Sequence, residues 1–109
     1  MRIYTVRLHA SLTGDGDTAE LSEQVLARLA DQGLYPDLAG PDDDGDYTFW
    51  LTLTADTPED SVARAGWGLR TAAVEASVAA GHHAEIEILA VEAQQLDVDS
   101  GAEHALTLA

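Results

Sequence analysis

Polar and apolar residues alternate with period two at the start of the chain, and this pattern predicts a half-buried strand over residues 2–10. Tyr4, Val6 and Leu8 fall on one face, whereas polar side chains such as Arg7 fall on the other. The stretch that follows is rich in Gly and Asp, which favour turns because both residues tolerate tight backbone conformations. The first predicted element is therefore a strand that ends in a turn.

A first helix is predicted over residues 18–32. Asp17 and Glu20 stand at capping-box spacing before a run of apolar residues that recur every three or four positions. Gly33 follows the last apolar turn, where glycine adopts the left-handed conformation that ends many helices. Residues 34–39 are apolar but contain Pro36, which confines a strand to the edge of a sheet.

The clearest strand covers residues 47–55, after a turn-rich segment at 40–46. Tyr47, Phe49, Leu51 and Leu53 fall on one face, and three threonines and Trp50 fall on the other. Thr57 then supplies a capping hydroxyl and Pro58 the favoured first helical residue, so a second helix is predicted over residues 58–80. Residues 84–93 alternate again and form the fourth predicted strand.

The order of elements is βαββαβ, which is the ferredoxin-like arrangement of the α+β class. In it, two helices cover one face of a four-stranded antiparallel sheet. Residues 1–93 are expected to form this single domain. Residues 94–109 form a C-terminal tail that packs on the second helix or takes part in association.

The amino-acid composition excludes several classes of binding partner. Twenty Asp and Glu face five Arg and no Lys among 109 residues, a formal net charge of −15. Phosphate contacts need clustered cations, so direct nucleic-acid binding and adsorption to an anionic membrane are not expected. The chain has no Cys and shows neither a secretory signal nor a long apolar run, so a cytoplasmic location is expected. Its alanine-rich, lysine-free composition is typical of a GC-rich bacterial or phage genome.

The uncovered face of the predicted sheet is the first candidate site. Strands one and three are central in this fold, so their outward residues should lie side by side, with residues of the fourth strand beside them. This surface carries little charge and a central aromatic, which indicates that a partner covers it; a second copy of the chain is the commonest cover. The residues expected there are Thr5, Arg7, His9, Thr48, Trp50, Thr52, Thr54, Glu85, Glu87, Leu89 and Val91.

Acidic turns and two histidines should gather at one end of the domain. They are Asp15, Asp17, Asp42, Asp43, Asp44, Asp46, His82 and His83. No spacing among them matches a calcium loop, and Asp and Gly are ordinary turn residues. His82, His83 and Asp15 are therefore only weak metal candidates, and neither a metal nor another cofactor is expected.

The same acids have two further interpretations. No cation occurs between Arg28 and Arg64, so one side of the molecule should attract a basic partner and could mimic the charge of nucleic acid. The alternative is that the acids serve solubility alone.

The second helix carries more apolar surface than a one-sided helix needs. One stripe of small residues should face the sheet, and a second stripe holds Ala63, Trp67, Val74 and Val78. Packing of the first helix and the tail on the second stripe is favoured over a partner, because small domains need all their internal apolar contacts.

The sequence favours a small, non-enzymatic, acidic interaction module that associates through its open sheet face. Its partner would be a second copy or a larger protein with a basic surface. The alternative is a small-molecule-binding or catalytic dimer that uses His9, Arg7 and Trp50 as base, anion anchor and stacking surface. No known catalytic motif supports this alternative.

Overall fold

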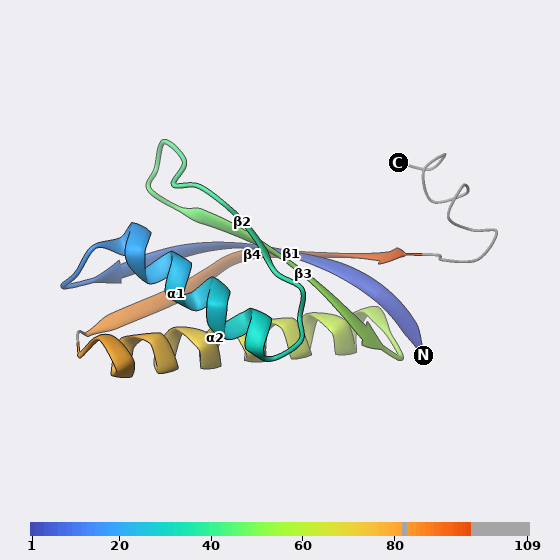
Figure 1. The fold of residues 1–109 in the computed structure, drawn as a ribbon. Helices are drawn as coiled ribbons and strands as arrows, with labels where there is room; N and C mark the ends of the chain where they lie inside the picture. The colour runs from blue at the N-terminus through green and yellow to red at the C-terminus, as the bar shows by residue number, and fades with distance from the viewer. Residues whose placement is uncertain (82, 97–109) are drawn as a thin grey trace.

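The computed structural model describes residues 1–81 and 83–96, which form six elements in the predicted order. The strands are β1 (Arg2–Gly14), β2 (Asp37–Ala39), β3 (Tyr47–Ala55) and β4 (Ala84–Leu96), and the helices are α1 (Thr18–Asp31) and α2 (Pro58–Ala80). All strand pairs are antiparallel, in the order β2-β3-β1-β4. Both helices lie on the same side of this sheet (Figure 1). The ferredoxin-like α+β fold is therefore confirmed.

Strand β1 is longer than predicted because the alternation of its side chains continues beyond Ala10. Leu12 is buried like the inward-facing residues before it. The added residues pair with the first half of β4, so that Thr13 lies opposite Glu85. The predicted turn therefore begins only after Gly14.

Strand β4 continues to Leu96, three residues beyond the predicted end of the fourth strand at residue 93. Residues 94–96 pair with Thr5, Tyr4 and Ile3 and belong to the sheet. The register shifts between His9 and Ala10, where β4 contains one extra residue. The remainder of the predicted tail, residues 97–109, lies outside the described residues.

The helices begin and end where the capping signals place them, within one residue. The Asp17 side chain accepts a hydrogen bond from the Ala19 backbone N–H, and the Thr57 hydroxyl accepts one from the Asp60 N–H. These bonds satisfy amides that have no partner within the helix. Gly81 ends α2 in the left-handed conformation, at φ 70°.

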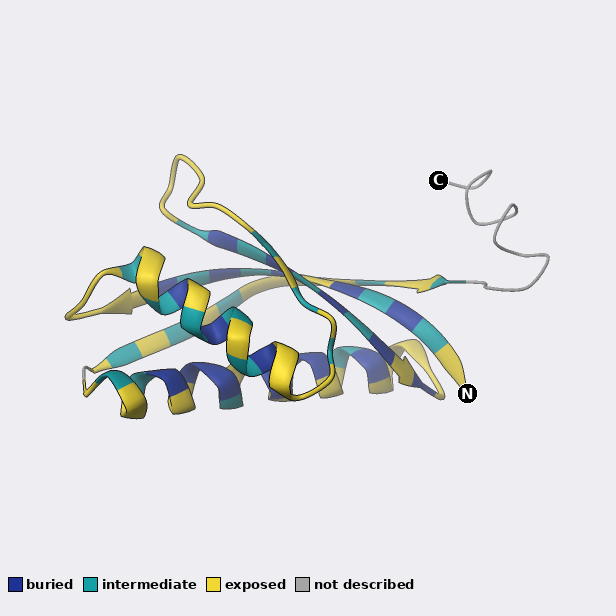
Figure 2. Ribbon diagram, in the orientation of Figure 1, coloured by how far each residue is buried: buried dark blue, intermediate teal, exposed yellow. Residues whose placement is uncertain are grey.

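The core lies between the helices and the inward face of the sheet (Figure 2). Its large side chains come from alternate positions of the central strands and from both helices, and they include Tyr4, Leu8, Leu29, Tyr47, Phe49, Leu51 and Leu69. Removing such side chains from water is the main driving force for folding. Among the described residues, no helix combines the length and the apolar character needed to cross a bilayer.

Helix α2 meets the segment after α1 through a buried glycine. Gln32 donates a side-chain hydrogen bond to the Gly68 carbonyl, 3.1 Å away. A Cβ at Gly68 would lie 2.7 Å from Leu34 Cδ1, so only glycine leaves this contact undisturbed. The Leu34 carbonyl in turn accepts from the Thr52 N–H of β3. Strand β2 is shorter than predicted and begins only after Pro36, because Tyr35 has a positive φ of 44° and Pro36 has no N–H for a strand pair.

Candidate functional site

The central strands bring most of the candidate sheet-face residues together. Three cross-strand pairs share the face away from the helices: Thr5 with Thr52, Arg7 with Trp50, and His9 with Thr48. Residues directly opposite in an antiparallel pair point to the same side of the sheet. Threonine side chains therefore surround one aromatic and two basic side chains on a surface that neither helix covers (Figure 1).

Charges near the middle of this face are largely balanced. Arg7 donates a hydrogen bond to Glu92 at 2.9 Å, and both side chains remain more than half exposed. Such an exposed pair contributes about 0–1 kcal/mol to stability. Trp50 lies opposite Arg7 on one side and Asp37 on the other, and it is only partly exposed.

The extra residue in β4 changes which of its side chains join the sheet face. Glu87 pairs with Ser11 and keeps its predicted outward position. Beyond the bulge, Val91 pairs with Leu8, which faces the core. The predicted outward register of Val91 is therefore wrong, because one extra residue reverses the alternation, although Val91 remains 38% exposed. Leu89 is itself the bulged residue and is exposed.

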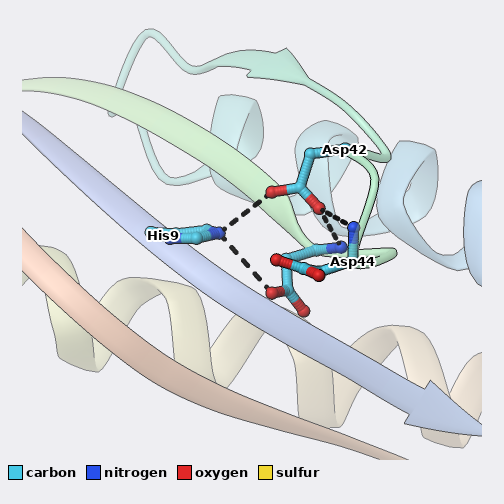
Figure 3. A network of polar contacts seen from close by, with 4 residues as sticks. His9, Asp42 and Asp44 are labelled. Atoms are coloured by element: carbon cyan, nitrogen blue, oxygen red, sulfur yellow. Dashed lines mark hydrogen bonds and ion pairs between the residues drawn. The ribbon is translucent and has the colours of Figure 1, made fainter.

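His9 lies between two carboxylates from the loop that joins β2 to β3. Its Nε2 atom is 3.3 Å from Asp42 Oδ2 and 3.7 Å from Asp46 Oδ2 (Figure 3). The nitrogen is buried and makes no hydrogen bond of normal geometry among the described residues. Sequence reasoning missed this cluster because it assigned His9 to the sheet face and the two acids to the distant end of the domain.

The loop holds Asp42 in place with its other oxygen. Asp42 Oδ1 accepts backbone N–H bonds from Asp44 and Asp46, both at 2.9 Å. The pKa of Asp42 lies below its usual range, chiefly because the Asp46 N–H stabilises the charged form, with smaller effects from the Asp44 N–H and the His9 imidazole.

The remaining acidic candidates form a second, separate group. Asp15 donates its backbone N–H to the His83 carbonyl at the far end of β1. The first residue of β3, Tyr47, lies opposite Ala10 of β1. Asp15 comes five residues after Ala10, and five residues of strand span about 16 Å. Asp15 and Asp17 are therefore remote from Asp42, Asp43, Asp44 and Asp46.

The two weak metal candidates that the structure describes, His83 and Asp15, do not belong to a three-residue ligand group among the described residues. His83 lies 3.4 Å from Glu85, and both side chains are about 70% exposed (71% and 72%). Among the described residues, the one group of three whose ligand atoms come together is His9, Asp42 and Asp46. His82 lies outside the described residues.

A small cavity adjoins the basic side chains of the sheet face. It has a volume of about 180 Å³ and is lined by Arg7, His9, Thr48, Ala90, Val91 and Glu92. Small-molecule sites usually have volumes of roughly 300–1,000 Å³. Trp50 does not line the cavity, so the three residues of the catalytic alternative do not enclose one pocket.

A second cavity of similar volume, about 180 Å³, lies between the start of α1 and the end of α2. Asp17, Glu20 and His83 are among the residues that line it.

Helix α2 exposes the second apolar stripe that the sequence indicates. Trp67, Val74 and Val78 are 74%, 63% and 76% exposed. The C-cap residue of α1, Gln32, contacts α2 elsewhere, at Gly68. The predicted cover by the first helix is thus wrong, and the predicted cover by residues beyond Leu96 lies outside the described residues.

Comparison with known proteins adds little to this geometry. No protein-family model and no curated protein matches the chain. Among solved structures, one similar chain is an amidase of the hydantoinase/carbamoylase family from Burkholderia multivorans, with a TM-score of 0.43 and 14% identity over 89% of this chain and 29% of that one. Another is the Bacillus subtilis YXEP protein, described as a dinuclear metal binding peptidase of the M20 family, with a TM-score of 0.44 and 15% identity over 98% of this chain and 32% of that one.

The chain thus spans about a third of the length of these structures. Similarity at this level carries no information about activity or ligands.

Proposed function

We propose that this protein is a non-enzymatic interaction module whose open sheet face binds a second copy of the chain. The observation that carries the proposal is the low-charge centre of that face, where Thr5, Thr48, Thr52 and Trp50 lie around the neutralising Arg7–Glu92 pair. Strands of a half-solvated antiparallel sheet usually direct apolar residues to the core and polar residues to solvent. Here the central solvent-facing positions include three uncharged threonines and a tryptophan.

The charge distribution favours this surface over the rest of the molecule as the place where two copies associate. Each copy carries a formal net charge of −15, so two copies repel each other at most orientations. Repulsion is smallest where an arginine offsets the acids and threonines carry no charge. A two-fold arrangement that places one Trp50 near the other would bury an aromatic of the kind that anchors many interfaces.

The test is the mass of the full chain by sedimentation velocity over a range of concentrations. A dimer is expected, and Trp50→Thr should raise its dissociation constant by about 30-fold, the size of a typical interface hot spot. Trp67→Gln is the matched control, because it removes the other tryptophan from the exposed side of α2 and should leave the dimer unchanged.

Two results would refute the proposal. One is a wild-type chain that stays monomeric at high concentration. The other is a dimer that Trp67→Gln dissociates and Trp50→Thr does not, which would move the interface to α2.

Salt separates this proposal from binding to a basic protein through the acidic surface. Screening of two like-charged copies should strengthen the dimer as ionic strength rises. Binding of a basic partner by the acidic residues at 42–46 and their neighbours should instead weaken as ionic strength rises. Binding to a basic protein that falls steeply with added salt, without any dimer, would favour the nucleic-acid mimic.

A further inference from the structure

Three side chains from two separate parts of the chain bring one metal-ligating atom each to the same point beside the sheet. His9 comes from the middle of β1, and Asp42 and Asp46 come from the loop before β3. Their ligand atoms all lie within 4.8 Å of one another. The side chains of Asp42 and His9 point toward each other from opposite sides of this space (Figure 3).

The imidazole nitrogen in this cluster is buried and makes no normal hydrogen bond within the described structure. A direct contact between imidazolium and carboxylate would be a charge-assisted bond of about 2.7–2.9 Å. The observed separations of 3.3 and 3.7 Å are longer than such a bond but still within ion-pair distance. The buried nitrogen therefore lies near two carboxylate oxygens without a hydrogen bond of normal geometry to either of them in the described structure.

We propose that His9, Asp42 and Asp46 bind one divalent transition-metal ion of the zinc type. Zinc bonds to imidazole nitrogen and carboxylate oxygen measure about 2.0–2.2 Å, and the edge of a tetrahedron with bonds of 2.0–2.1 Å is about 3.3–3.4 Å. The two measured ligand separations, 3.3 and 3.7 Å, are close to this edge. Three protein ligands leave the fourth position to water.

The ligand types select among cations. Calcium and magnesium are bound by oxygen ligands and are usually surrounded by six or more of them. An imidazole ligand instead suits zinc and its transition-metal neighbours. The side chain of Asp46 is only 16% exposed, whereas those of His9 and Asp42 are 38% and 45% exposed, so the site is shielded on one side and open on the other. The surrounding negative charge of the loop adds attraction for a dication.

The proposed metal site does not depend on the proposed association. It lies at the edge of the sheet face, where the loop contacts β1, and it is complete within one copy of the chain. Its main physical effect would be to tie that loop to the central strand, since a ligand that binds only the folded state stabilises it.

The experiment is calorimetric titration of the full chain, freed of metal by a chelator, with Zn²⁺ alone. One equivalent should bind, and His9→Gln or Asp46→Asn should weaken binding at least about tenfold, because loss of an outer-shell partner alone often costs that much. Asp42→Asn should do the same while its amide oxygen still accepts the two loop N–H bonds.

Matched controls separate a defined site from diffuse attraction. Asp43→Asn removes one charge from the same loop, and His83→Gln removes an exposed imidazole elsewhere, so both should change the affinity for Zn²⁺ far less than the three ligand variants do. Thermal unfolding of every variant without metal shows whether it is folded. Equal losses in Asp43→Asn and Asp46→Asn would overturn the proposal, as would several weak equivalents unaffected by His9→Gln or tighter binding of Ca²⁺ than of Zn²⁺.

Discussion

The hydroxyl of Tyr4 is buried in the core and has no hydrogen bond within the described part of the chain, and we expect its removal to stabilise the protein. Tyr4 is 1% exposed, and its oxygen makes no hydrogen bond within the described residues. An unsatisfied buried polar group costs about 1–3 kcal/mol. Tyr4→Phe keeps the ring and its packing, so the free energy of unfolding should rise by about 1 kcal/mol. For a domain of this size, the melting temperature should rise by roughly 4 °C.

Tyr47→Phe is the matched control for this prediction. Tyr47 is 2% exposed, and its hydroxyl lies 3.4 Å from the Thr18 hydroxyl, across the interface between β3 and α1. Loss of this long hydrogen bond should lower the free energy of unfolding by about 0.5–1 kcal/mol. Urea titration followed by far-ultraviolet circular dichroism, at one fixed protein concentration, measures both changes. If Tyr4→Phe destabilised the protein as much as Tyr47→Phe, the Tyr4 hydroxyl would have a partner, such as a buried water, and the reasoning would fail.

Three further substitutions test the local backbone. Gly14→Ala would place a Cβ 2.6 Å from the His83 carbonyl, so urea titration should show a loss of about 1–3 kcal/mol. Gly40→Ala places a Cβ on a backbone with φ 125°, 2.8 Å from the Asp46 carbonyl oxygen. Thermal unfolding should therefore show a loss of about 1–3 kcal/mol in the free energy of unfolding, and the loop should become more sensitive to proteolysis. Thr57→Ala removes the cap of α2 and should lower the free energy of unfolding by about 1 kcal/mol, whereas Thr57→Ser should not.

The fold could be predicted from the sequence because its signals were local and agreed with one another. Alternation identified the central strands, and caps such as Asp17 and Thr57 identified where the helices begin. The sequence places the ends of the first and fourth strands too early, after Ala10 and after residue 93. Both strand ends depend on pairing between β1 and β4. Pairing of strands distant in sequence extends both of them, and no local turn signal reports it.

The candidate site was only partly predictable for the same reason. The neighbours of Arg7 and Trp50 follow from the strand order, which the fold class supplies. The meeting of His9 with Asp42 and Asp46 depends on how the loop before β3 folds back beside β1. The register that places His9 opposite Thr48 was the available signal, since it puts that loop within reach of the imidazole.

The two tryptophans lie on opposite faces of the protein, and this arrangement makes each face separately visible to fluorescence. Trp50 is partly covered on the sheet, whereas Trp67 is 74% exposed on α2. Replacing either one leaves a single indole whose emission and quenching report the hydration of one surface alone. The chain has no cysteine thiol and no lysine amine to carry a conventional dye, so these native indoles are the natural optical probes of which face becomes covered.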